Sequence, residues 1–498
     1  MPDILAARSQ MAMSLAFHII FAVVGVGMPA LMVAAERRWL TTGDSLYLDL
    51  AKRWAKGTAI LFAVGAVSGT VLSFELGLLW PRFMEFSGAI VGLPFALEGF
   101  AFFTEAIFLG VYLYGWDRIP PRAHLAAGAL VALSGTLSAI FVVIANAWMN
   151  SPAGLDVVDG RPANVSPLRA MANPATFPET LHMTLAAFAA TGLAVAGIHA
   201  FLLLRLRAAG RHDAPGMHGA IAAFHRRALS IALLVGAPAA ILQPISGDVS
   251  ARFVARWQPV KLASMEGQFA TERGAPLRLG GWPDVEARET PWAIEIPRAL
   301  SLLAFHDPNA VVRGLDEFPR DDWPPVRVVH VAFQIMVASG TAMALVALWA
   351  AWTAWRARRR VGARVDAVDA ADGAWRGASP WLLRALVLVA PLGFVAVEAG
   401  WTVTEVGRQP WIVYGLLRTA DAVTPVPGLV VPFISFTLLY CLLGVIVVVL
   451  LYRQIVRTGA RSRPGGAGPG PESRPDAPRD VPRSATPEAP LPTPRSRA

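Results

Sequence analysis

The sequence predicts an all-α integral membrane protein: a bundle of nine transmembrane helices with a large loop on one side and a disordered C-terminal tail. Apolar residues make up 55% of the 498 residues and charged residues only 16%, against about 25% charged in ordinary globular domains. The mean hydropathy is +0.48. The apolar residues also gather into nine runs, most of them close to the length of about 20 residues that a bilayer span requires.

The nine runs divide the chain into spans and loops. They cover residues 12–34, 57–79, 94–114, 125–147, 181–204, 229–245, 326–351, 381–403 and 430–451. The first run has no strongly basic segment before it, and Glu36-Arg37-Arg38 follows it where a cleaved signal peptide would have small residues. We therefore expect the first run to stay in the protein as a helix.

The distribution of Lys and Arg predicts the orientation of the helices. These residues are concentrated after the first, third, fifth and seventh runs, as in the segment Arg358–Arg360, and are sparser after the second and fourth. Positively charged loops generally face the cytoplasm. We therefore expect the N-terminus outside and the C-terminus in the cytoplasm.

Four regions follow from this pattern. Residues 1–246 hold helices one to six, 247–325 form an outer loop, 326–456 hold helices seven to nine, and 457–498 form a cytoplasmic tail. The loop is too long for a passive connector and is rich in Trp and Phe, so we expect it to be ordered and functional. The tail is rich in Arg, Pro, Gly and Ser, a composition typical of disorder.

The remaining composition excludes several classes of protein. The net charge of +9 comes largely from Arg-rich loops and the tail, so the sequence does not indicate a nucleic-acid-binding domain. The single cysteine, Cys441, excludes an intrachain disulfide, a zinc finger and a covalent C-x-x-C-H haem site.

A few polar or sulfur-containing residues within the spans are candidate functional groups, because an ionisable side chain in a span costs a few kcal/mol. With the orientation above, five of them fall in the outer half of the bilayer, on five helices: His18, Glu98, His182, Met336 and Glu405. By contrast, Glu75 and Glu398 are more typical of hydrogen bonds between helices. We expect Arg384 and His199 to reach toward the inner surface, and His124 and His225 to lie in cytoplasmic loops without a ligand role.

Two His, a Met and carboxylates at one depth suggest haem. A His/Met axial pair is typical of a low-spin electron-transfer haem, whereas a haem with one strong protein ligand keeps a face open for oxygen. Glu98 and Glu105 are seven residues apart and share one helix face, so they could pass protons to a buried site. Alternatives remain: a haem-free proton-coupled transporter, or a quinone-linked cytochrome b that binds no oxygen.

The outer loop carries a second candidate site. Lys261 is its only lysine, and it lies in the segment Gln258-Pro-Val-Lys-Leu-Ala-Ser-Met-Glu266. A Lys and a Glu at the membrane surface could bind and deprotonate a lipid-soluble hydroxylated ring, although an ordinary surface ion pair would look the same in sequence. We expect this loop to lie outside the layer of haem ligands.

Several motifs resemble subunit I of the cytochrome bd-type quinol oxidases. The most specific is Glu405-Val-Gly-Arg-Gln-Pro-Trp411, which contains a G-R-Q-P-W signature. The segments 97–105, 144–149, 258–266 and 333–337 also fit, and the resemblance spans all nine runs in order. It implies a bacterial inner-membrane enzyme that oxidises ubiquinol or menaquinol outside and reduces O2 to water with cytoplasmic protons. Such an enzyme generates proton-motive force without a pump.

The resemblance also implies roles for individual residues. His182 and Met336 match the axial ligands of a low-spin haem b. His18 and Glu405 match ligands of two haems at the oxygen site, a high-spin haem b together with haem d or a second high-spin haem b. Glu98 and Glu105 match carboxylates near that site, and Lys261 and Glu266 match the quinol-oxidation residues of the outer loop, the Q-loop.

The implied partners are the lipid bilayer and a second oxidase subunit, with room for a small single-helix subunit, and no nucleic acid. Two departures concern the haem set. Gln334 stands where many relatives carry Arg, and an amide cannot stabilise haem propionates as a guanidinium does. The Q-loop has the short form found in the cyanide-insensitive branch, whose members can carry haem b in place of haem d.

Overall fold

Nine long apolar helices make up most of the part of the chain that the structure describes. The structure is a computed structural model, and it describes residues 1–211, 216–361 and 373–453. Within these ranges nine helices are long and apolar enough to cross a membrane, as the nine runs predict. They are α1 (Asp3–Thr42), α2 (Ser45–Leu79), α3 (Pro81–Tyr114), α4 (Pro121–Asn150), α6 (Thr176–Ala208), α7 (Met217–Trp257), α10 (Val326–Val361), the pair α12 (Pro380–Val389) and α13 (Leu392–Val406), and α15 (Val430–Tyr452). The tail predicted to be disordered, 457–498, lies outside the described residues.

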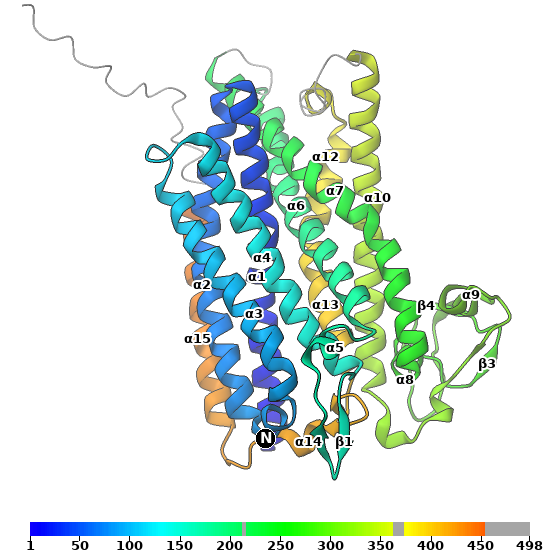
Figure 1. Cartoon of the computed structure of the whole chain (residues 1–498). Coiled ribbons are helices and arrows are strands. Elements are labelled where there is room, and N and C mark those ends of the chain that lie inside the picture. The colour runs from blue at the N-terminus through cyan, green and yellow to red at the C-terminus, as the bar shows by residue number, and fades with distance from the viewer. Residues whose placement is uncertain (212–215, 362–372, 454–498) are drawn as a thin grey trace, which may run out of the picture. The chain divides into compact units, whose positions relative to one another are not determined.

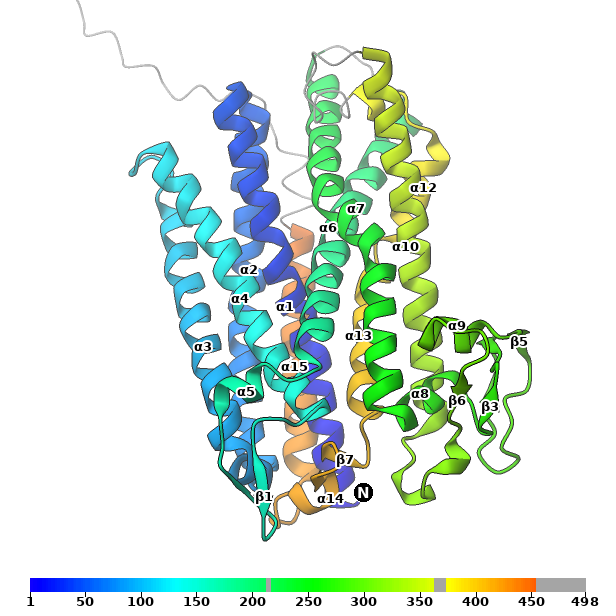
Figure 2. The ribbon, with the colours of Figure 1, turned by 45° about the vertical axis from the view of Figure 1, so that its right-hand side comes forward.

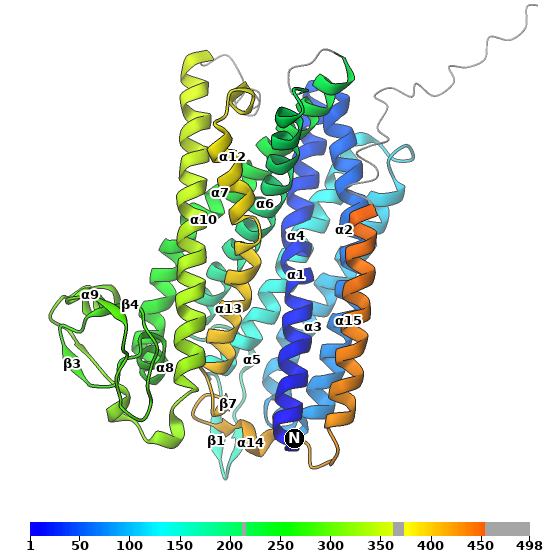
Figure 3. The ribbon, with the colours of Figure 1, turned by 180° about the vertical axis from the view of Figure 1, so that it is seen from behind.

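The spanning helices pack side by side in two linked groups. Helix α1 packs against α2, α4, α6 and α15, and α3 packs against α4 (Figures 1 and 3). Helix α6 packs against α7 and α12, and α10 packs against α7 and α13. Buried Ala, Leu and Val residues fill the contacts among α6, α7, α10 and α12. Helix α6 touches both groups and therefore connects them.

Local sequence signals explain several helix ends. Helix α1 ends at Gly43, whose φ of 72° is the left-handed conformation that glycine adopts without strain. Asp44 then begins α2, because its carboxylate accepts a hydrogen bond from the Leu46 amide at 3.0 Å. The eighth span breaks into α12 and α13 next to Pro391, which has no amide hydrogen to donate.

The outer loop is built from short regular elements, as its Trp and Phe content suggests. It contains α8 (Pro259–Glu266), α9 (Ala299–Phe305), two 3-10 turns (Leu315–Glu317 and Arg320–Asp322) and two antiparallel strand pairs (Figure 2). The pairs are β3 (Glu272–Arg273) with β6 (Val311–Val312), and β4 (Leu277–Gly280) with β5 (Ala293–Ile296). The segment predicted as loop, 247–325, begins with the last turns of α7, which continues to Trp257. A helix can extend beyond its apolar run because its backbone hydrogen bonds do not depend on hydropathy.

The other short elements lie at the same end of the helices as the N-terminus (Figures 1 and 3). They are the hairpin β1 (Asp156–Val158) and β2 (Arg161–Ala163), α5 (Pro167–Met171), the hairpin β7 (Trp411–Val413) and β8 (Leu417–Arg418), and α14 (Thr419–Ala422). Helix α8 and the loop strands are at this end too (Figure 2). The relative placement of N-terminus and loop therefore agrees with the predicted alternation of the spans.

Two expectations about histidines near the opposite end are wrong. His124 is not in a solvated loop: it is buried in α4, and its Nδ1 lies 2.7 Å from Oε1 of the buried Glu36. His225 lies within α7, and His199 does not reach the surface, since the Nδ1 atoms of these two residues are 3.0 Å apart and His199 is buried. The helices extend beyond the apolar runs, so polar residues flanking a run become interior residues of the bundle.

Candidate functional site

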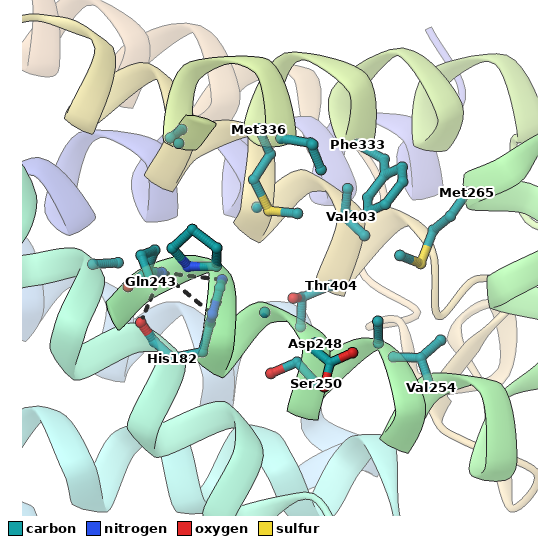
Figure 4. Close-up of a pocket in the computed structure, with 18 of the residues that line it drawn as sticks. His182, Gln243, Asp248, Ser250, Val254, Met265, Phe333, Met336, Val403 and Thr404 are labelled. Atoms are coloured by element: carbon teal, nitrogen blue, oxygen red, sulfur yellow. Dashed lines mark hydrogen bonds between the residues drawn. The ribbon is translucent and has the colours of Figure 1, made fainter. Parts of the chain in front are cut away.

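A cavity of about 460 Å³ lies among α6, α7, α8, α10 and α13. Four of the predicted site residues line it: His182, Met336, Lys261 and Glu266. Figure 4 shows the His182 imidazole and the Met336 thioether directed into this space from α6 and α10. Residues from two distant helices and from the loop therefore meet at one place.

The hydrogen bonds of His182 fix the orientation of its ring. Ser246 Oγ donates to the Gln243 carbonyl oxygen at 2.9 Å, and its 2.9 Å contact with His182 Nδ1 therefore favours Nδ1 as the donor, while the Gln243 amide nitrogen lies 3.3 Å from the same ring atom. The lone pair then lies on Nε2, and the Gln243 amide nitrogen is 3.2 Å from it. An imidazole with a hydrogen-bonded Nδ1–H and a lone pair on Nε2 is the usual form of a metal-ligating histidine.

Small residues make room around Met336. A Cβ atom at Gly400 would lie 3.0 Å from Met336 Sδ, and one at Gly247 would lie 3.5 Å from His182 Cε1. Gly340 and Gly393 also line the cavity. The cavity wall is largely apolar and has little side-chain bulk, and it carries a soft sulfur and an imidazole nitrogen. These features fit a flat macrocycle that takes two axial ligands.

A guanidinium reaches the cavity from the loop. Gln334 on α10 holds strand β4, because its amide nitrogen donates to the Arg278 carbonyl oxygen at 3.0 Å and its oxygen accepts from the Gly280 amide at 3.1 Å. Arg278 lines the cavity and its Nε donates to Glu295 at 3.0 Å. A guanidinium paired with Glu295 therefore lines the cavity although residue 334 is neutral.

Lys261 and Glu266 are both buried on α8 and do not form a surface ion pair. Lys261 Nζ donates to Asn150 Oδ1 at 3.0 Å and to the Thr404 carbonyl oxygen at 3.3 Å. Both side chains share the cavity with His182 and Met336, which a loop lying apart from these two residues would not do. Helix α8 folds back against α7 and α10, which sequence spacing alone does not indicate.

Burial changes the acid–base behaviour of these two loop residues. Burial raises the pKa of Glu266 to about 8, with the positive charge of Arg278 acting in the opposite direction. Burial also lowers the pKa of Lys261, while the negative charge of Glu179 opposes this effect. Among the described residues, Glu266 Oε2 has no hydrogen-bond partner. A carboxyl of this kind can exchange a proton with a bound hydroxyl group near neutral pH.

His18 lies on α1 outside the lining of this cavity. Ser68 Oγ donates to the carbonyl oxygens of Val64 and Gly65, so its 3.0 Å contact with His18 Nδ1 again makes Nδ1 the donor and leaves the lone pair on Nε2. The ring packs on α2, where a Cβ atom at Gly69 would lie 2.9 Å from His18 Cε1. The geometry is thus suited to a second ligating imidazole.

Glu405 near the end of α13 is held by two partners. Asn146 of α4 donates to Oε1 and Arg408 donates to Oε2, both at 2.5 Å. Arg408 is buried, whereas the Glu405 side chain is 28% exposed. Both partners lie in motifs that the sequence singled out, but their bonds to Glu405 depend on the fold.

Glu98 and Glu105 both face α4, as their spacing predicts. Ser138 Oγ donates to Glu98 Oε1 at 3.2 Å. A Cβ atom at Gly135 would lie 3.0 Å from the Glu105 carboxyl group. The missing side chain at Gly135 therefore provides the space in which the Glu105 carboxyl is buried.

An apolar cluster connects the surroundings of His18 with the cavity. Ile19 of α1 and Val397 of α13 belong to this cluster, and Met183 and Trp401 pack against it. Val397, Met183 and Trp401 also line the cavity. A few packed apolar side chains therefore separate the region around His18 from the cavity that contains His182.

Three further polar residues of the site could not be recognised from the sequence. Gln243 contacts the His182 ring, Asn150 accepts from Lys261, and Glu179 lines the cavity and acts on Lys261. Glu179 lies just before an apolar run and therefore looks like an interfacial residue. The clue in each case is a partner more than 60 residues away in the chain, which no spacing rule detects.

Comparisons with known proteins agree on one family. Residues 6–459 match the family model described as cytochrome bd terminal oxidase subunit I. The chain is 38% identical to a candidate cytochrome bd menaquinol oxidase subunit I of Bacillus subtilis (strain 168), over 91% of this chain and 96% of that protein. It is 31% identical to the cytochrome bd ubiquinol oxidase subunit 1 of the same organism, over 91% and 94%. The solved bd oxidase from Geobacillus thermodenitrificans matches with a TM-score of 0.80 and 36% identity, over 92% of this chain and 99% of that chain.

Proposed function

This chain belongs to the cytochrome bd terminal oxidase subunit I family, and on that basis we propose how its residues divide the work of a quinol oxidase. As a member of the family it is a membrane-bound terminal oxidase, an oxidoreductase that uses haem, quinol and O2 together with a second subunit. The rival classes, a haem-free transporter and a cytochrome b without oxygen chemistry, are not favoured.

His182 Nε2 and Met336 Sδ would hold the low-spin haem b. The single observation that carries this assignment is that both side chains line one apolar cavity from different helices, with glycines opposite each of them. When bound there, the haem supplies reversible one-electron transfer, and a His/Met pair raises its potential. Ser246 orients the imidazole, and the apolar walls exclude water.

Quinol is oxidised at the α8 end of the same cavity. Lys261 orients the ring hydroxyl, and Glu266 accepts a proton from it through its free oxygen. Because Lys261 and Glu266 share the cavity with His182 and Met336, electrons have a short path inward. Arg278 supplies the positive charge that offsets negative groups in this space. The chemical class of the substrate is a membrane quinol, either ubiquinol or menaquinol.

The oxygen site takes His18, beyond the apolar cluster, and Glu405, whose partner Asn146 and neighbour Thr404 line the cavity and whose charge acts on Lys261. His18 has a free Nε2 by the hydrogen-bond argument above, and Glu405 is held by Asn146 and Arg408, so each can ligate one of two further haems. We assign these as a high-spin haem b and either haem d or a second high-spin haem b. Glu98 and Glu105 carry protons to this site along the α3–α4 contact.

The loop end of the helices faces the periplasm and the opposite end the cytoplasm, as the Lys and Arg distribution indicates. Protons from quinol leave on the loop side, whereas protons for water enter from the other side. Each electron then moves about one charge across the membrane, worth roughly 2.3 kcal/mol per 100 mV. Proton-motive force arises without a conformational pump.

Spectra of the purified two-subunit complex test this arrangement. A reduced-minus-oxidised spectrum, repeated with carbon monoxide, distinguishes a haem with an open iron from one with two protein ligands. We expect His182→Ala to remove the low-spin signal and keep the carbon monoxide shift. We expect His18→Ala to diminish the shift and keep the low-spin signal. The same signal lost in both variants would contradict the two-site assignment.

A further inference from the structure

A buried acid–imidazole pair lies at the end of the bundle opposite the outer loop, outside the sites assigned above. Glu36 of α1 is 0% exposed and His124 of α4 is 2% exposed. Their side chains meet at 2.7 Å between Oε1 and Nδ1. Tyr112, near the end of α3, is also fully buried and joins them. Three helices thus bring their polar residues together where the proposed function requires protons to enter.

The hydrogen bonds of His124 show that this pair holds a proton. His124 Nε2 lies 2.9 Å from the Tyr112 carbonyl oxygen, which can only accept, so Nε2 carries a hydrogen. The bond between Nδ1 and Glu36 then contains one proton in either of its forms: a neutral acid donating to the imidazole, or an imidazolium donating to the carboxylate. The other carboxyl oxygen remains available for exchange.

Two atoms beside this bond are poised to pass a proton on. In the described part of the chain neither Glu36 Oε2 nor the Tyr112 hydroxyl has a hydrogen-bond partner, although both are buried. The two groups are neighbours, because Glu36 acts on the Tyr112 hydroxyl through its charge and through a side-chain contact that falls short of hydrogen-bond geometry. Leaving a buried polar atom unpaired usually costs about 1–3 kcal/mol. Two such atoms side by side indicate a role other than stability alone.

Tyr112 continues the line of Glu98 and Glu105 on α3. The three residues are seven apart, so they lie near one helix face. All three face α4: Ser138 bonds Glu98, Gly135 adjoins the Glu105 carboxyl, and a Cβ atom at Gly128 would lie 2.7 Å from the Tyr112 ring. Seven residues correspond to roughly 10 Å of helix, a gap that two or three water molecules at hydrogen-bond spacing can bridge.

We propose that Glu36, His124 and Tyr112 form the inner entrance of the proton path to Glu105 and the oxygen site. A proton arriving from the inner side is taken up by the Glu36 carboxyl. Glu36 releases one from Oε2 to the Tyr112 hydroxyl, and the hydroxyl gives up its own proton on its other side to water. Each group ends with the number of protons it had. His124 keeps the carboxyl in position, and it is a positioning residue.

The surroundings of the pair separate it from bulk water. The Trp116 ring lies 4.0 Å from the His124 ring, centroid to centroid, and Lys52 Nζ lies over Trp116 at 5.2 Å. On α2 and α7, Tyr47 and Arg227 lie nearby, and Arg227 is paired with Asp44 at 2.6 Å. Glu36 is six residues from the end of α1, or about 9 Å along the helix axis. The carboxyl is therefore buried within about two helical turns of the end of α1.

The decisive variant is Glu36→Gln in the complete oxidase complex. Glutamine keeps the hydrogen bond, because its amide can donate to His124 Nδ1, but it has no transferable proton. Proton uptake during a single turnover with O2 is followed in liposomes with a pH dye, beside haem content and the rate of haem reduction by quinol. We expect uptake to slow at least tenfold while haem content and haem reduction stay within twofold of wild type. Asp49→Asn, at an exposed carboxylate of the same end, is the control and should change nothing.

The inference rests on the proposed function, and these measurements separate the two. Normal proton uptake in Glu36→Gln with full haem content would overturn the entrance but leave the haem assignments intact. Loss of haem reduction by quinol in the wild-type complex would instead contradict the proposed function. If Glu36→Gln fails to assemble, Tyr112→Phe is the deciding variant, because it removes only the hydroxyl group beside Glu36. Slower proton uptake supports the route, and unchanged uptake rejects it.

Discussion

Gly400 on α13 faces the thioether of Met336 on α10 so closely that a Cβ atom at position 400 would lie 3.0 Å from Sδ. This distance is shorter than ordinary van der Waals contact, so the sulfur occupies space that only a glycine leaves open. The position of the sulfur relative to the cavity therefore depends on two helices, and each offers a separate way of testing the ligand assignment.

Met336→Leu should convert the low-spin haem signal without unfolding the protein. Leucine nearly conserves the volume, and such exchanges usually cost less than about 1.5 kcal/mol, but it has no sulfur to bind iron. The measurement is the reduced-minus-oxidised spectrum of the purified complex together with its thermal stability. An unchanged low-spin spectrum would remove Met336 from the ligand set.

Gly400→Ala should alter the same signal while Met336 remains in place. The added methyl group pushes Sδ away, so we expect a broadened or shifted low-spin band and a lower haem potential. Gly77→Ala is the matched control, because nothing lies within 4 Å of a Cβ atom there. Equal spectra for the two glycine variants would mean that the thioether is not near the iron.

The pH dependence of quinol oxidation should report Glu266. Its pKa is raised to about 8 by burial, so at pH 6 the group is largely protonated and cannot accept a proton. The rate should therefore rise with pH through a transition near pH 8. In Glu266→Gln the rate should be at least tenfold lower and this transition should be absent. A wild-type profile that is flat from pH 6 to 9 would argue against Glu266 as the acceptor.

Arg278→Met should move that transition to higher pH. The positive charge of Arg278 lowers the pKa of Glu266, so its removal raises the pKa further. The same substitution removes a cation from the cavity of His182 and Met336, and the low-spin haem potential should fall as well. Arg273→Met, at a loop arginine outside the cavity lining, provides the control. A pH profile that does not move would separate Arg278 from the quinol site.

Lys261→Met should reduce quinol oxidation at least tenfold and also perturb the low-spin haem. Methionine fills the space of the buried stem but loses the bonds to Asn150 and to the Thr404 carbonyl. Sequence position alone predicted an effect on quinol without any effect on the haem spectrum. The shared cavity predicts both, and redox titration beside quinol kinetics distinguishes the two predictions.

The sequence predicted the membrane fold well because hydropathy records contact with lipid directly. All nine runs fall within helices that are long enough to span a membrane. The helix ends were predicted less well, since hydrogen bonds carry a helix beyond its apolar run: α7 continues to Trp257. The same effect hid Glu36 and His124, which flank apolar runs and yet are buried against each other.

Candidate site residues could be named from sequence, but their grouping could not. An ionisable residue such as His182 or Glu105 within an apolar run can be recognised from the sequence alone. It costs free energy in a membrane span, so it is a candidate functional residue. That Lys261 shares a cavity with His182 depends on α8 folding back between α7 and α10. The roles of Gln243 and Gln334 likewise come from partners far along the chain.

The remaining prediction concerns Glu105, whose carboxyl fits against α4 because residue 135 is glycine. Glu105→Gln keeps the shape and the hydrogen-bonding capacity but cannot carry a proton. If protons reach the oxygen site along this face, haem reduction by quinol should stay nearly normal while oxygen reduction slows at least tenfold. If the carboxyl instead holds a haem, haem content should fall together with activity.

Gly135→Ala provides the matched test of position for the same carboxyl. Its methyl group would lie 3.0 Å from the carboxyl atoms and must displace them, although the titratable group is retained. If Glu105 carries protons, Gly135→Ala displaces it by only a fraction of an ångström. Gly135→Ala should then slow oxygen reduction less than Glu105→Gln does, with haem content unchanged. A haem-holding group should lose haem in both variants. Haem content and single-turnover oxygen kinetics on the same preparations separate these outcomes, and full activity with full haem content in Glu105→Gln would exclude both roles.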